Sequence, residues 1–145
     1  MNTHSMHAGP RKALPALALA MAIGTVALPS AALADGALGI WKTAVKEDGR
    51  FLHVDVQPCD GGAVTLCGTV VGAFGGASES SIGRQILWDM EPDGENAWAD
   101  GKVWAPDDDK TYSGKMELKG GGTLELSGCV LGGLICRGQD WTRVD

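Results

Sequence analysis

Residues 123–143 read TLELSGCVLGGLICRGQDWTR, and this stretch predicts a β-hairpin. Its centre is Gly132-Gly133, a two-residue turn of the kind that needs positive φ at both positions. With the turn there, residues whose numbers sum to 265 face each other, so Cys129 lies opposite Cys136. Directly opposed strand residues have Cα atoms about 4.5–5.5 Å apart, within the range that a disulfide spans. The sequence therefore predicts a disulfide between these two cysteines.

The same register predicts which side chains share a face. Alternation puts Arg137, Gln139 and Trp141 on the face that carries Leu124 and Leu126. This apolar face is expected to be the interior, and an inward arginine needs a partner because an unpaired buried charge costs several kcal/mol. Two interpretations are open. Arg137 and Gln139 form an internal salt bridge or water network, or they hold the polar head of a bound molecule.

Three more residues complete the candidate site under the second interpretation. Trp41, Tyr112 and Met116, with aliphatic side chains, are expected to contact the apolar part of the ligand.

The rest of the chain reads as short strands between turns. Residues 51–57 alternate, with Leu52, Val54 and Val56 on one face. The frequent glycines suit tight turns and bent strands better than helices. About eight strands are predicted, near residues 39–45, 51–58, 63–73, 84–90, 96–105, 111–118, 123–131 and 134–144. The predicted fold is all-β: a small, closed, up-and-down antiparallel barrel, because closure removes exposed strand edges.

The N-terminal segment predicts export. A polar, weakly basic start is followed by an apolar run over residues 13–28 and by a small-x-small cleavage site, Ala32-Leu33-Ala34. The signal peptide is therefore predicted as residues 1–34, which leaves residues 35–145 as a single domain in the periplasm or outside the cell. The alternative is an uncleaved anchor, but prolines and a glycine interrupt the run, which is shorter than the ~20 residues a span requires.

The processed chain is acidic and has no further apolar run of membrane-spanning length. Removal of Arg11 and Lys12 takes the net charge from −6 to −8. An acidic chain is a poor binder of nucleic acid. Neither nucleic acid nor a stable membrane span is therefore expected. The expected partner is a small apolar or amphipathic ligand, and the sequence identifies no protein partner.

The four cysteines are typical of a disulfide framework in a small exported domain. Of three possible connectivities, the local pairs Cys59–Cys67 and Cys129–Cys136 are favoured, because a turn-rich loop joins the first two. A zinc site of four thiolates is the alternative, but no Cys-x-x-Cys spacing supports it. Neither a metal nor another cofactor is expected.

Two short motifs at the ends of the processed chain support closure. Gly39-Ile40-Trp41 near the start and Trp141-Thr142-Arg143 near the end resemble the lipocalin and fatty-acid-binding (calycin) group. In that group an arginine of the last strand packs over the tryptophan of the first. A guanidinium over an indole contributes about 0.5–2 kcal/mol. The resemblance implies that Arg143 covers Trp41 where the barrel closes.

A longer resemblance covers nearly the whole processed chain. The motifs QPC with LCG (57–59, 66–68), ILWDM (86–90), GKVWAPDD (101–108), KTY (110–112) and SGCVLGGLICR (127–137) occur in this order. They are similar to the bacterial domain of unknown function 2147 family, which implies a small secreted β-barrel of unassigned activity. Asp109 stands where that family commonly has glycine, and Ala105 where an acidic residue often precedes the proline.

Catalysis has little support in the sequence. His53 is the only histidine after residue 34 and alternates onto the polar face of its strand, and no Gly-x-Ser-x-Gly motif is present. Asp107-Asp108-Asp109 lacks calcium-loop spacing and is interpreted as a solvated acidic turn. Residues 75–81 are a small, polar loop, interpreted either as a solvated connection or as a guard at the barrel mouth.

The favoured function is therefore non-enzymatic binding of a small apolar or amphipathic molecule inside the barrel. The alternative is an envelope structural or interaction module whose barrel is filled by side chains. An enzyme is a third class. A cavity near Arg137 favours the first and a solid core favours the second.

Overall fold

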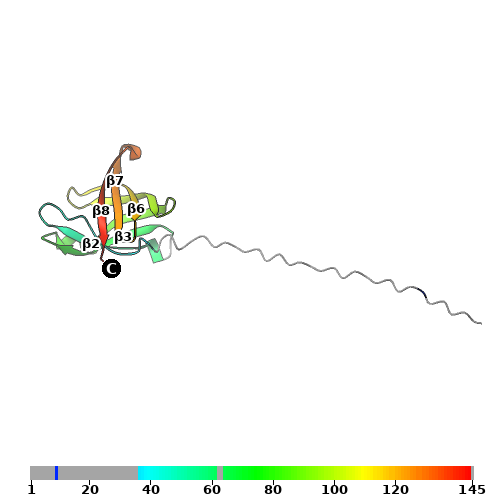
Figure 1. Ribbon diagram of the computed structural model, residues 1–145. Helices are drawn as coiled ribbons and strands as arrows, with labels where there is room; N and C mark the ends of the chain where they lie inside the picture. Colours follow the sequence, from blue (N-terminus) through cyan, green and yellow to red (C-terminus); the bar gives the residue numbers. More distant parts are fainter. Residues whose placement is uncertain (1–8, 10–35, 62–63, 145) are drawn as a thin grey trace, which may run out of the picture.

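Eight antiparallel strands form a closed barrel (Figure 1). The structure, a computed structural model, describes residue 9 and residues 36–61 and 64–144; the predicted signal peptide and its cleavage site lie outside these residues, apart from Gly9. The strands are β1 (Gly39–Lys42), β2 (Phe51–Pro58), β3 (Leu66–Phe74), β4 (Gln85–Pro92), β5 (Ala97–Ala105), β6 (Lys110–Lys119), β7 (Thr123–Val130) and β8 (Ile135–Arg143). Each strand pairs with its sequence neighbours and β1 pairs with β8, which confirms the predicted up-and-down barrel.

Short connections join the strands. Three of them contain a 3-10 turn: η1 (Cys59–Gly61), η2 (Glu79–Ser81) and η3 (Leu131–Gly133). Within the described part of the chain, none of the helical segments has the length and apolar character needed to cross a bilayer.

The β7–β8 hairpin has the register that its sequence predicts. Cys129 pairs with Cys136 and Val130 pairs with Ile135, and Gly132 and Gly133 have φ of 67° and 90°. The ladder ends at the Val130–Ile135 pair, so Leu131 and Leu134, which the predicted register also pairs, do not face each other. Instead Leu131 has a positive φ of 53°, and the Leu134 N–H donates to the Leu131 carbonyl in a tight turn.

The barrel closes where β1 meets β8. Trp41 and Arg143 are register partners, and the guanidinium carbon of Arg143 lies 4.2 Å from the centre of the Trp41 ring. Trp41 is fully buried and its Nε1–H donates to the Ala37 carbonyl at 2.8 Å. Arg143 donates to the carbonyls of Gly36 and Leu38, which ties the segment before β1 across this end.

Alternating side chains along the strands form the core of the barrel. The side chains of Leu52, Val54 and Val56 on β2 are buried, while their neighbours along the strand are not. The largest fully buried side chains are Trp41, Trp98, Trp141, Leu66, Leu87, Met90, Leu124 and Leu126. Two disulfides, Cys59–Cys67 and Cys129–Cys136, join strand ends.

Candidate functional site

The other end of the barrel opens into a cavity of about 920 Å³. Apolar residues from four strands and two indoles contribute to its wall: Leu52, Ile86, Val103, Leu126, Trp104 and Trp141. Its mouth is formed by residues 43–50, 77–84 and 105–109 of the connections between strands, together with the end of the β7–β8 hairpin. The cavity therefore has apolar side chains inside and polar side chains at the opening.

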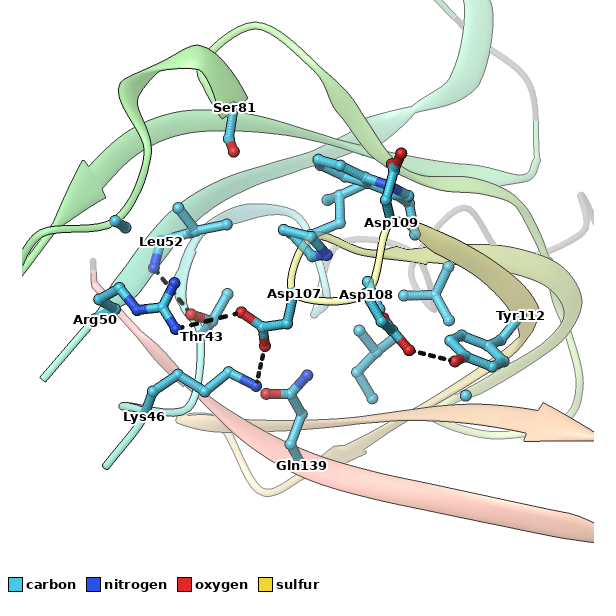
Figure 2. Close-up of a pocket in the computed structure, with 18 of the residues that line it drawn as sticks. Thr43, Lys46, Arg50, Leu52, Ser81, Asp107, Asp108, Asp109, Tyr112 and Gln139 are labelled. Atoms are coloured by element: carbon cyan, nitrogen blue, oxygen red, sulfur yellow. Dashed lines mark hydrogen bonds and ion pairs between the residues drawn. The ribbon is translucent and has the colours of Figure 1, made fainter. Parts of the chain in front are cut away.

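Three consecutive aspartates lie at the mouth (Figure 2), and each contacts a different element. Asp107 pairs with Lys46 of the β1–β2 connection at 2.7 Å, and its other oxygen lies 3.8 Å from Arg50. Asp108 accepts a hydrogen bond from the Tyr112 hydroxyl at 2.6 Å. Exposed ion pairs contribute about 0.2–1 kcal/mol each, so these contacts mainly position the side chains around the opening.

Asp109 completes this arrangement with an indole and a guanidinium. Trp104 Nε1–H donates to Asp109 at 2.9 Å, and the guanidinium carbon of Arg84 lies 3.6 Å from the centre of the Trp104 ring. Asp109 has a φ of 50°, a left-handed conformation that aspartate tolerates better than most residues. Glycine, the residue that the family resemblance implies at this position, adopts the same conformation without strain.

Tyr112 is the only tyrosine of the chain, so its ionisation can be followed alone. Its hydrogen bond to Asp108 raises the pKa of the phenol above its usual 10.0, while the nearby Arg137 acts in the opposite direction. We expect Asp108→Asn to move the midpoint of the tyrosinate absorbance titration down, because the phenol then no longer ionises beside a carboxylate. Asp107→Asn is the matched control and should leave the midpoint in place; equal shifts in both variants would contradict the assignment.

The structure separates the five expected ligand contacts into two groups. Arg137, Gln139 and Tyr112 line the cavity. Trp41 and Met116 do not line it; both lie in the packed half of the barrel, toward the end where β1 meets β8, among other core side chains. Both are interior residues, but the sequence pattern carries no information on depth along the barrel axis.

Arg137 and Gln139 point into the cavity yet remain exposed, which corrects the expectation that they are buried. The barrel is open at this level, so water reaches both side chains. Within residues 36–61 and 64–144, Arg137 forms no ion pair, whereas Lys46, Arg50 and Arg84 each have an aspartate within 4.0 Å. A solvated arginine needs no partner, which removes the argument for an internal salt bridge.

Sequence reasoning missed the cations that face the acidic turn. Lys46 and Arg50 lie in an exposed, polar connection whose composition gives no sign of a site. The sequence did offer a signal for the acidic side of the mouth: the GKVWAPDD motif at 101–108 places a cavity tryptophan within a few residues of the aspartates.

The polar loop at residues 75–81 and His53 differ in their relation to the cavity. Ala77, Ser78, Ser80 and Ser81 from the polar loop line the cavity, so this loop belongs to the mouth. The His53 ring, by contrast, packs at 4.4 Å from the Phe74 ring and lines no part of the cavity. His53 is therefore not placed to act on a molecule inside.

Comparison with known proteins finds a matching family model and a solved structure with a similar fold. Residues 39–143 match a family model described as an uncharacterized protein conserved in bacteria (DUF2147). A solved structure of HP1028 from Helicobacter pylori, described as belonging to the lipocalin family, has a TM-score of 0.60 and is 17% identical. The alignment covers 74% of this chain and 82% of HP1028. None of the curated proteins matches the sequence.

Proposed function

Because the chain belongs to the bacterial DUF2147 family and folds as a lipocalin-like barrel, we propose that it is an exported protein that binds a small amphipathic molecule inside the barrel. The observation that carries the proposal is the open cavity of about 920 Å³. Sites for small molecules typically measure about 300–1,000 Å³ and combine an apolar wall with a few polar groups. A barrel filled by side chains, as the alternative function requires, would leave no such space.

The charges at the mouth favour an acidic head group on the ligand. Arg137 projects into the cavity without an ion pair among the described residues, beside Tyr112 and Gln139. A charge-assisted hydrogen bond to a carboxylate contributes about 1.5–3 kcal/mol, more than a bond between neutral groups. The apolar wall takes the hydrocarbon part and Arg137 takes the acid.

Export is part of the same proposal. Both cysteine pairs are oxidised, and disulfides persist in compartments outside the cytosol. Cleavage after Ala34 stays a prediction; the mass of the protein recovered from the envelope of expressing cells measures it directly.

Fluorescence titration with dodecanoate tests the function, because Trp104 and Trp141 line the cavity. We expect a saturable change in emission. Gly128→Phe should weaken binding about 5- to 150-fold, the equivalent of the 1–3 kcal/mol that overpacking costs. Gly128 lines the cavity, and a Cβ there makes only ordinary contacts, 3.4 Å or more from its neighbours, so the variant should fold.

Two controls separate the parts of the proposal. Ser127→Phe places the same ring one residue earlier, on the other face of β7, and should leave affinity unchanged. Arg137→Gln should weaken dodecanoate about tenfold and leave dodecanol unchanged, since only the acid uses the guanidinium. A flat titration, or undiminished binding by Gly128→Phe, would overturn the proposed function.

A further inference from the structure

The end of the β7–β8 hairpin is an exposed apolar projection. Residues 130–135 read VLGGLI and are here called the apolar tip. The four large side chains of the tip are 42% (Val130), 69% (Leu131), 85% (Leu134) and 52% (Ile135) exposed. Figure 1 shows this part of the chain, in orange-brown, rising clear of the rest of the barrel.

The tip is held in this position by its own base. The Cys129–Cys136 disulfide joins the two strands directly below it, and the Val130–Ile135 pair continues the ladder. Leu131, Gly132 and Gly133 all have positive φ, which completes a tight turn. The tip is thus a short, cross-linked loop that keeps its leucines in solvent instead of folding them onto the core.

We propose that the apolar tip inserts into the surface of a lipid bilayer and sets the mouth of the cavity against it. This inference rests on the proposed function and names the source of the ligand. Val130 and Ile135 belong to the tip and also line the cavity, so one continuous apolar surface runs from the projection into the barrel. Insertion would let a hydrocarbon chain pass between bilayer and cavity with little exposure to water.

The size and composition of the tip favour a bilayer over a protein partner. A stable protein interface uses about 20–30 residues a side and is enriched in aromatic residues and arginine, whereas the tip has six residues, four of them aliphatic and two glycine. None of its side chains can form a hydrogen bond. Insertion of a few aliphatic side chains requires no such complementarity.

The position of Arg137 fits the same orientation. It follows the last tip residue by two positions, about 7 Å along the strand, where a guanidinium can reach the head groups while the tip lies among the acyl chains. The processed chain is otherwise acidic, so attraction to anionic lipid is not the driving force. Binding should therefore persist on zwitterionic vesicles and at high salt.

Flotation with phosphatidylcholine vesicles tests the proposal on protein recovered after export. We expect the double variant Leu131→Asn, Leu134→Ser to partition about 100-fold less than the wild type, because two leucine side chains no longer leave water. Asparagine suits the left-handed conformation at position 131, and both side chains are exposed, so the variant should fold. Val64→Ser, which removes a 77% exposed side chain from the β2–β3 connection at the opposite end, should float like the wild type.

The solution titration with dodecanoate keeps this result separate from the proposed function. The double variant should bind dodecanoate as tightly as the wild type when vesicles are absent, because Leu131 and Leu134 do not line the cavity. Vesicle binding without dodecanoate binding would overturn the proposed function and leave the tip as a membrane contact. Dodecanoate binding with no flotation, or equal flotation of wild type and double variant, would overturn the membrane contact. Loss of a protein complex in the double variant, with vesicles unbound, would assign the tip to a protein partner instead.

Discussion

Replacing Trp41 by alanine is expected to lower the free energy of unfolding by about 3–5 kcal/mol, the range for a buried tryptophan. The indole is fully buried, donates to the Ala37 carbonyl and lies under Arg143. It also lies at the strand junction with the fewest register pairs, because β1 and β8 share only two. A domain of this size has a total stability of about 5–15 kcal/mol, so the loss is a large part of it. Urea unfolding followed by far-ultraviolet circular dichroism measures it.

Trp88→Ala is the matched control. Trp88 is only partly buried and lines a shallow depression on β4 and β5 beside Lys102. Its removal should cost about 1 kcal/mol, the centre of the distribution for single substitutions. Equal losses in the two variants would show that covering the barrel end with an indole and a guanidinium is not what stabilises the closure.

Gly101→Ala is expected to destabilise the barrel by about 3 kcal/mol, the upper part of the range for overpacking. A methyl group at this buried position would overlap the carbonyl oxygen of Trp88 and approach the Cα of Met90 to 2.9 Å. Both are backbone atoms of β4, so no rotamer change relieves the contact and the two strands must separate. The midpoint and slope of urea unfolding report the loss.

Gly114→Ala tests whether the backbone is responsible. Gly114 pairs with Gly101 across β5 and β6, and a methyl group there meets mainly the flexible end of the Met90 side chain. We expect Gly114→Ala to lower the free energy of unfolding by about 1 kcal/mol. In a Met90→Leu background this loss should be smaller, because the thioether end that the new methyl group meets is then gone. If Gly114→Ala proves as damaging as Gly101→Ala, the contact with the β4 backbone is not the cause.

The two glycines also show why the sequence predicts strands better than their packing. Gly101 and Gly114 look like any other strand glycines in the sequence, where they suggest only a bend or a close approach. Their role becomes visible when β4, β5 and β6 are assembled and Met90 is found above both. Such a contact depends on three strands at once, and no local pattern contains it.

For the candidate site, the sequence predicts which face of a strand a side chain takes but not its depth in the barrel or its partners from other turns. Alternation in the last strand correctly placed Arg137 and Gln139 toward the interior, since the period of two decides which face a side chain takes. Trp41 and Met116 were expected at the ligand as well, but nothing in the sequence indicates that they lie in the packed half instead of at the cavity. The pairing of Asp107 with Lys46 escaped prediction because the two residues come from turns about sixty positions apart.

The sequence by itself determined the strands, the up-and-down order, the register of the last hairpin and the pairing of Cys129 with Cys136, because turn chemistry and side-chain alternation act over a few residues. The tertiary structure alone decided where the packed half ends and the cavity begins, which cations at the mouth are paired, and that VLGGLI projects into solvent. Those properties depend on how side chains from several distant turns fill a shared volume, and that volume exists only once the barrel is closed.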